Sequence, residues 1–398
     1  MANRSCPRFR VASGHWRPNL MSKPSPLFTL SLSATLLMLG VGMIVALLPQ
    51  RIHALTGSLE SVGLVASVFA FAYLLAQLPV SAFSDRLGPK RFLVIGYLTC
   101  GMSGLLYVAS DTAGGIFLGR IVQGLGEAPI WALGPAILSL AYPTTKGRVI
   151  GIYNAAIHIG LTAGPLLGLL IAPDGQGDAP FVVFAALCLA AGIVVFLFLR
   201  VPSVPVGQQG TEGRQIVALL RERQVVVLLV GVLLYGAGYG AFLTVLPISL
   251  AATHGLGTTA ISLHFVLFYA AISASQIVAG AASDRIGRRG FLIWGMALAA
   301  IGLVALPVFP GLSVFWPLAV ASIGLGMFCV ASITELNARA PDGLKGAASG
   351  SYYVFWAAGY VLGPWAIGSS AGSTPVVGFT LLAGAFALMA VALQSLRN

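Results

Sequence analysis

Long apolar stretches separated by short polar segments make up most of the chain. Each stretch holds about 20 residues or more, enough for a helix to cross the ~30 Å hydrocarbon layer of a membrane. Backbone groups in lipid must be hydrogen-bonded within their own segment, so helices are the expected form. The pattern predicts twelve membrane-spanning helices, at residues 27–49, 58–82, 91–109, 113–140, 149–172, 180–200, 225–250, 258–281, 290–309, 312–336, 346–371 and 374–396.

The polar segments indicate that the chain is an internal duplication. Segment 81–91 reads Ser-Ala-Phe-Ser-Asp-Arg-Leu-Gly-Pro-Lys-Arg, and segment 280–289 reads Gly-Ala-Ala-Ser-Asp-Arg-Ile-Gly-Arg-Arg. Their aspartates, Asp85 and Asp284, are 199 residues apart. Further pairs at this offset are Gln77 and Gln276, Gly147 and Gly346, Gly151 and Gly350, Tyr153 and Tyr352, Gly160 and Gly359, and Gly164-Pro165 and Gly363-Pro364. A repeat in an apolar chain is typical of a transporter built from two bundles.

The predicted fold is therefore an all-α integral membrane protein with two pseudo-symmetric six-helix bundles. We place the N-terminal bundle at 27–200, a cytoplasmic linker at 201–224 and the C-terminal bundle at 225–398. Residues 1–26 form a basic arm without the apolar core of a signal peptide. Met21 opens the polar segment ahead of the first span, and we interpret it as the natural start of the protein.

Composition and charge support this topology. Hydrophobic residues make up 58% and charged residues 8% of the chain, against about 25% charged residues in soluble domains. If both termini are cytoplasmic, the 22 Lys and Arg residues all fall in cytoplasmic segments, except Arg51 in an outer loop and Arg120 inside a span. This asymmetry predicts cytoplasmic termini in a bacterial-type inner (plasma) membrane. The net charge of +11 thus reports topology and not nucleic-acid binding.

Span 113–140 carries the strongest candidate chemistry. Arg120 and Glu127 are seven residues apart, hence on one helical face about 10 Å apart along the axis. Burial disfavours an ionised carboxyl group and a nearby cation favours it, so Glu127 is our candidate for proton coupling. We expect Arg120 to tune Glu127 or to serve a proton route through Gln123. The alternatives are direct binding of a cationic substrate at Glu127, in competition with a proton, and a purely structural Arg–Glu pair.

Other polar and aromatic residues in the spans are weaker candidates for a central cavity. The two intramembrane histidines are as easily explained by hydrogen-bonded packing as by function, and the aromatic residues by packing or by anchoring at the membrane surface. The possible cavity residues are Asn154, His158, Tyr235, Tyr239, His264, Tyr269, Tyr353 and Trp356.

The duplicated polar phrases predict a cytoplasmic gate formed by Asp85, Arg86, Asp284, Arg285 and Arg288. An acid beside the amino end of a helix is stabilised by about 0.3–1 kcal/mol. The repeat suggests that each aspartate meets a span start in the other half, near residues 346 and 147 respectively, and so closes the cytoplasmic face. The alternative is simple anchoring of charges at the membrane surface.

On these motifs the chain resembles the major facilitator superfamily from residue 27 to 396. Segment 280–289 matches the family's Gly-x-x-x-Asp-Arg-x-Gly-Arg-Arg/Lys loop, whereas Ser81 and Pro89 depart from it in the first copy. Arg120-x-x-Gln123-Gly124 resembles a signature of proton-exchanging members. The motif Gly160, Gly164, Pro165 and Gly168 resembles that of exporting antiporters, although close packing of small residues explains it as well.

The resemblance implies the drug/metabolite:proton antiporter branch, in which a secondary transporter exports small organic compounds by alternating access. The alternatives are a proton-coupled importer of a small metabolite and a transporter-like sensor without flux. No phosphate-binding loop and no clustered metal ligands occur in the sequence, so we expect neither an enzyme nor a cofactor. The expected partners are a small-molecule substrate, protons and the lipid bilayer, with no nucleic acid, and the expected state is a monomer.

Overall fold

The structure is a computed structural model that describes residues 24–142, 146–174, 177–201, 221–340, 345–370 and 376–394. The α-helices in chain order are α1 (Pro26–Thr56), α2 (Leu59–Leu87), α3 (Pro89–Val108), α4 (Ala113–Ala141), α5 (Lys146–Ile171), α6 (Ala179–Phe198), α8 (Arg223–Leu243), α9 (Val245–His254), α10 (Thr258–Ile286), α11 (Arg289–Ala305), α12 (Phe315–Arg339), α13 (Lys345–Ser370) and α14 (Val376–Leu393). Short 3-10 turns at Leu306–Val308 and Gly311–Val314 separate α11 from α12.

Helix occupies every predicted span, and in the described residues eleven helices are long and apolar enough to cross a membrane. The remaining predicted span is α13, whose sequence mixes glycine, serine, tyrosine and tryptophan with its apolar residues. This helix packs between α8 of its own half and α2 of the other half. Helix contacts on two sides compensate for its low apolarity, since small residues let neighbouring backbones approach closely.

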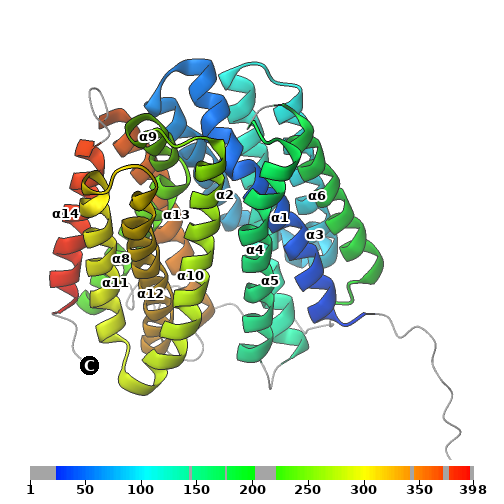
Figure 1. Ribbon diagram of the computed structural model, residues 1–398. Coiled ribbons are helices and arrows are strands. Elements are labelled where there is room, and N and C mark those ends of the chain that lie inside the picture. The colour runs from blue at the N-terminus through cyan, green and yellow to red at the C-terminus, as the bar shows by residue number, and fades with distance from the viewer. Residues whose placement is uncertain are drawn as a thin grey trace, which may run out of the picture.

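The helices form two halves that lie side by side (Figure 1). In the first half α1 packs on α5 and α6, and α3 packs on α4 and α6. In the second half α8 packs on α13, and α11 packs on α12 and α14. The halves meet along two helix pairs, α2 with α13 and α5 with α10. These pairs correspond to one another under the repeat, so one type of contact joins the halves twice.

A single backbone feature explains the glycine of the duplicated phrases. Gly88 joins α2 to α3 with a φ of +81°, and Gly287 joins α10 to α11 with a φ of +93°. Both values fall in the region that side chains with a Cβ rarely adopt. Pro89 then occupies the first turn of α3, where its missing N–H costs nothing. The phrase therefore ends one helix and begins the next in each half.

The predicted gate is described only in part. The side chains of Asp85, Arg86 and Asp284 lie outside the described residues, so the helix-start contacts expected of them stay predictions. Arg285 is exposed. The Nη1 atom of Arg288 lies 3.6 Å from Oε2 of Glu335 in α12, and Glu335 also bonds Arg339 one turn later, at 2.6 Å.

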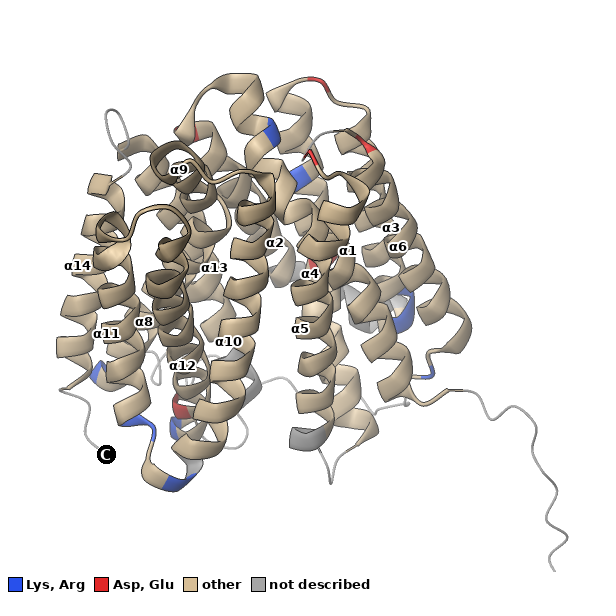
Figure 2. Ribbon diagram, in the orientation of Figure 1, with Lys and Arg blue, Asp and Glu red and all other residues tan. Residues whose placement is uncertain are grey.

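Charged residues divide the bundle into two ends (Figure 2). Lys90, Arg91, Arg288, Arg289 and Arg339 lie where α2 meets α3, where α10 meets α11 and where α12 ends, and we call this the basic end. The α1–α2 connection and the start of α6 lie at the opposite end. There Nη1 of Arg51 pairs with Asp178 at 2.8 Å, and its Nη2 donates to the Ser110 carbonyl. Arg51 is thus bonded to the start of α6 and to the α3–α4 connection.

The prediction of one continuous helix at 225–250 is wrong. The segment divides at Thr244, where φ is −127° and ψ is −76°, into α8 and the short α9. Pro247 explains the break, because a proline has no N–H to donate and its ring collides with the carbonyl four residues earlier.

The glycine-rich motif of α5 packs against α1. A Cβ on Gly160 would lie 2.7 Å from the Thr35 carbonyl oxygen, and one on Gly164 would lie 2.5 Å from that of Leu39. The equivalent Gly359 and Gly363 bring α13 equally close to α8. In both copies, therefore, the motif lets two helices of the same half pack closely.

The α2–α13 contact closes the opposite end of the bundle. The Ser67 hydroxyl donates to the Val361 carbonyl at 2.5 Å. A Cβ on Gly63 would collide with the Pro364 carbonyl, and one on Gly368 would lie 2.5 Å from that of Leu59. The two backbones touch over about two turns, so substrate-sized molecules cannot pass between these helices there.

We expect Gly63→Ala to loosen this closure, because the added methyl group has no space against the Pro364 carbonyl. Labelling of a cysteine at Ser67 by a polar maleimide should rise several-fold, in a protein whose native cysteines are replaced by serine. Gly151→Ala is the matched control, since nothing lies within 4 Å of a Cβ there. Equal labelling in both variants would contradict the closure.

Candidate functional site

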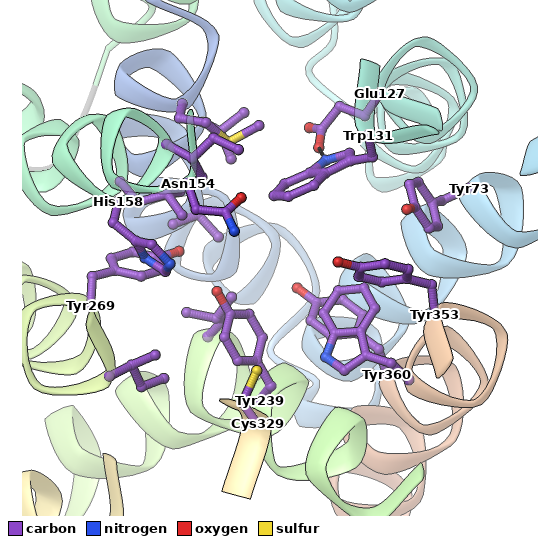
Figure 3. A pocket seen from close by; sticks show the side chains of 18 of the residues that line it. Tyr73, Glu127, Trp131, Asn154, His158, Tyr239, Tyr269, Cys329, Tyr353 and Tyr360 are labelled. Atoms are coloured by element: carbon purple, nitrogen blue, oxygen red, sulfur yellow. Dashed lines mark hydrogen bonds between the residues drawn. The ribbon is translucent and has the colours of Figure 1, made fainter. Parts of the chain in front are cut away.

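A cavity of about 270 Å³ lies between the two halves (Figure 3). Its walls come from α1, α2, α4 and α5 of the first half and from α8, α10, α12 and α13 of the second. Because both halves contribute walls, any motion of one half against the other changes the shape of the cavity.

The charged wall of the cavity is one face of α4. Arg120, Gln123, Glu127 and Trp131 follow one another at steps of three and four residues, so their side chains share a helical face. Arg120 and Glu127 are only 4% and 3% exposed. Buried charges of this kind require hydrogen-bond partners, since ions in a poorly solvated interior are costly.

Gln123 joins the two charges. Its Oε1 accepts from Nη1 of Arg120 at 2.9 Å, and its Nε2 donates to Oε1 of Glu127 at 2.8 Å. The second carboxylate oxygen of Glu127 accepts from the indole Nε1 of Trp131 at 3.2 Å. The direct Arg–Glu pair considered as a structural alternative is therefore not formed, because an amide lies between the two charges. The arrangement leaves Glu127 hydrogen-bonded by neutral donors at the cavity wall.

Groups from other helices complete the environment of Arg120. Its Nε donates to the Val65 carbonyl of α2 at 3.0 Å, and its guanidinium lies 4.3 Å from the ring centroid of Phe69. The hydroxyl of Tyr107 in α3 donates to Oε1 of Gln123 at 2.7 Å. The positive charge is thus compensated by a carbonyl, an amide and an aromatic face.

Aromatic side chains of the second half form the facing wall. The ring of Tyr239 lies 5.9 Å from Tyr235, 5.8 Å from Trp356 and 6.1 Å from Tyr360, centroid to centroid. The Tyr360 ring reaches Phe69 of the first half at 6.3 Å. Aromatic rings in such contact present flat apolar faces and polar edges to a ligand.

A second polar region lies on α5 and α10, away from Glu127 (Figure 3). Asn154 and His158 stand one turn apart on α5, and the His158 imidazole pairs with the side-chain amide of Gln276 on α10. This pairing joins the halves at the α5–α10 contact. Gln276 is the repeat mate of Gln77, whose amide donates at 3.4 Å to the Ala128 carbonyl in α4.

The cavity opens toward the basic end. Along one face of α13, Tyr353 is 42% exposed and Tyr360 is 3% exposed, and both line the cavity. Tyr353 is the residue nearer to the helix start, which follows the basic end of α12. Asn154, near the start of α5, is also exposed. Together with the α2–α13 closure, these exposures of the described residues indicate a state in which the cavity is accessible from the basic end.

Most of the candidate residues named from the sequence line this cavity. They are Arg120, Gln123, Glu127, Asn154, His158, Tyr235, Tyr239, Tyr269, Tyr353 and Trp356. His264 does not: it is 1% exposed, among Phe242, Phe265 and Phe268, and its Nε2 lies 3.0 Å from the Phe242 carbonyl. That carbonyl stands next to the α8–α9 break. His264 therefore supports the broken helix and lies outside the cavity.

Sequence reasoning missed several lining residues, among them Phe69, Tyr73, Trp131, Gln276, Cys329, Tyr352 and Tyr360. For some of them, helical spacing from a named candidate could have predicted a place on the same helix face. Trp131 follows Glu127 by four residues, and Tyr360 follows Trp356 by four. The described residues contain no group of three His, Cys, Asp or Glu side chains placed to hold a metal ion.

Two repeated halves of apolar helices with a cavity between them are the architecture of a membrane transporter. The family model of the Major Facilitator Superfamily matches residues 30–364. The chain belongs to this superfamily.

Curated relatives and solved structures agree with the assignment. The chain is 29% identical to multidrug resistance protein 1 of Bacillus subtilis over 178 residues, which cover 44% of this chain and 46% of that protein. It is 25% identical to the fosmidomycin resistance protein of Escherichia coli over 326 residues, or 79% and 78% of the two chains. The matches to the first curated relatives thus span less than half of their length.

The fold itself is that of a solved transporter. The crystal structure of a point mutant of the nucleoside transporter NupG superposes with a TM-score of 0.80. The superposition covers 93% of this chain and 99% of that one, at 14% sequence identity. At this identity the likeness shows the arrangement of helices alone.

We expect Gln123→Leu to destabilise the protein by about 1–3 kcal/mol, because Arg120, Glu127 and Tyr107 each lose a buried hydrogen-bond partner. Thermal unfolding in detergent measures this loss. Gln50→Leu is the matched control, since the hydrogen bond that Gln50 makes among the described residues is to the Ala46 carbonyl of its own helix, near the end of α1. An equal fall in midpoint for both variants would refute the bridging role of Gln123.

Proposed function

We propose that this major facilitator transporter is a proton-coupled exporter of small organic compounds, such as drugs. It works as a monomer in a bacterial-type inner membrane, with both termini and the basic end on the cytoplasmic side. The basic end holds most of the described Lys and Arg residues, which supports this orientation under the positive-inside rule.

The observation that carries the proposal is the position of Glu127. Its side chain is almost fully buried, forms part of the cavity wall and accepts hydrogen bonds from Gln123 and Trp131. A carboxyl group in such a place changes its charge when access to water changes, because burial favours the neutral form and hydration the ionised form. Alternating access can therefore load and release a proton at this one group.

The names of the relatives support export. Two of them are a multidrug and a fosmidomycin resistance protein, and resistance to a toxic compound is commonly achieved by removing it. The motif of Gly160, Gly164 and Pro165 resembles that of exporting antiporters, in addition to its packing role. The described state offers its cavity to the basic end, from which a cytoplasmic compound would enter.

The proposed cycle uses the two contacts between the halves as a rocking hinge. Parting of α2 from α13 opens the opposite end, while approach of the basic-end portions of α5 and α10, which already meet further along, closes the basic end. A proton that enters from the outside neutralises Glu127 and releases the substrate there. The proton leaves when the cavity again opens to the cytoplasm, and the ionised carboxylate is then ready for the next substrate.

We expect Glu127→Gln to abolish export against a gradient while leaving the fold intact, since glutamine has the shape of glutamate and its one oxygen still accepts from Gln123. Cells that make the parent protein should accumulate less of at least one toxic organic compound than cells that make the variant. In proteoliposomes, the pH dependence of flux of that compound should disappear. Glu60→Gln, at an exposed site near the start of α2, is the control.

The direction of proton movement tests the mechanism. Adding the transported compound to one side should drive protons toward that side in an antiporter and away from it in a symporter. If protons move in the same direction as the compound, the protein is a symporter, and the proposal of export is wrong. If no toxic compound tested for accumulation in cells shows counterflow in proteoliposomes, the protein is not a transporter of those compounds, and the alternative of a sensor is favoured. Unchanged efflux and unchanged pH dependence in Glu127→Gln would remove this residue from coupling.

A further inference from the structure

Apart from the tyrosine hydroxyls and the Cys329 thiol, the polar side chains of the cavity stand in two separate places. Glu127 and Trp131 lie on α4, and Asn154, His158 and Gln276 lie on α5 and α10 (Figure 3). Aromatic rings of α8, α10 and α13 occupy much of the remaining wall. A ligand that satisfies both places needs two polar ends and a flat apolar body between them.

The α4 end is suited to a cation. Glu127 is the one acidic side chain among the cavity-lining residues that the structure describes. The guanidinium of Arg120 is already bonded to Gln123 and Val65 and lies against the Phe69 ring. An ammonium group on a ligand would find a carboxylate and nearby aromatic faces, both of which attract cations.

The α5 end is suited to a neutral hydrogen-bond donor. Among the described residues, His158 Nδ1 is the one buried side-chain nitrogen or oxygen that belongs to a cavity-lining residue and lacks a hydrogen-bond partner. Gln276 pairs with the imidazole, and its amide can accept from or donate to it. We take the tautomer in which Nε2–H donates to the amide oxygen, which leaves a lone pair on the unpaired Nδ1. An unpaired acceptor beside a cavity is a cost that a ligand hydroxyl or N–H can remove.

The size of the cavity restricts the ligand further. Its volume of about 270 Å³ lies just below the ~300–1,000 Å³ range of pockets for drug-sized molecules. The facing rings of Tyr239, Trp356 and Tyr360 are 5.2–6.1 Å apart, centroid to centroid, which favours a planar group stacked against them.

We propose, on the basis of the proposed function, that the substrate is a compact organic cation with a flat aromatic body and a neutral hydrogen-bond donor at its far end. Its ammonium group binds Glu127, its ring lies along the aromatic wall, and its donor bonds Nδ1 of His158. His158 is then a specificity-determining residue, with Gln276 holding the imidazole in the accepting tautomer.

Three related probes separate the two ends: tyramine carries an amine and a ring hydroxyl, phenethylamine lacks the hydroxyl, and tyrosol replaces the amine by a neutral alcohol. Binding to the purified full-length protein in detergent is measured by titration calorimetry at one pH. We expect tyramine to bind about three- to tenfold tighter than phenethylamine, the effect of one hydrogen bond. We expect it to bind at least about tenfold tighter than tyrosol, the effect of a charge-assisted bond.

Two substitutions of one histidine test the assigned nitrogen. His158→Asn places an amide oxygen near the position of Nδ1, whereas His158→Gln places its polar end near that of Nε2 and leaves no acceptor at Nδ1. The tyramine-to-phenethylamine affinity ratio should persist in His158→Asn and fall to about one in His158→Gln. Glu127→Gln should reduce the tyramine-to-tyrosol ratio instead. His53→Gln, near the end of α1 and outside the cavity, should change neither ratio.

Two results would overturn the assignment. The first is a tyramine affinity that fails to exceed that of phenethylamine or that of tyrosol, which includes absence of tyramine binding. The second is a tyramine-to-phenethylamine affinity ratio that changes equally in His158→Asn and His158→Gln. These measurements use no gradient, so their failure leaves proton-coupled export of another compound untouched. Conversely, loss of pH-driven flux with both preferences intact would refute the proposed function and retain the ligand assignment.

Discussion

The site depends on two opposite charges that share one face of α4 without touching. Arg120 and Glu127 are buried in a bundle that offers little water, and each is stabilised chiefly by neutral groups. Gln123 satisfies both of them through one amide. A direct ion pair would hold the carboxylate in its charged form, because removing either partner from a buried pair is costly. The amide instead leaves Glu127 at the cavity wall, where a proton or a cation can reach it.

The rest of the bundle positions this helix face and controls access to it. Groups of α2 and α3 bond or stack on Arg120 and Gln123, and Tyr360 of α13 also bonds Arg120, so the network joins α4 to its own half and to the other half. The second half contributes the aromatic wall and the α10 partner of His158. Contact of α2 with α13 at Gly63 and Ser67 closes one end, while Tyr353 remains exposed toward the other. The same pair of halves thus forms the site and its entrance.

Much of the fold follows from local sequence. Apolar length predicts the helices because a backbone in lipid has no other way to satisfy its hydrogen bonds, and the duplication predicts two halves. The glycines at 88 and 287 mark turns that need a positive φ. The prediction of a continuous helix at 225–250 was wrong, although the sequence contains Pro247, the residue that explains the break. A proline in a membrane span bends some helices and breaks others, and neighbouring helices decide between the two outcomes.

The sequence by itself determined the helices, the repeat and the α4 face on which Arg120, Gln123 and Glu127 stand, since all of these depend on composition and helical period. Only the tertiary structure decided which side chains from other helices face that surface. It placed His158 at the cavity and His264 outside it, although both are lone histidines in apolar spans. A helical period shows which residues share a face, but the packing of distant helices determines what that face meets.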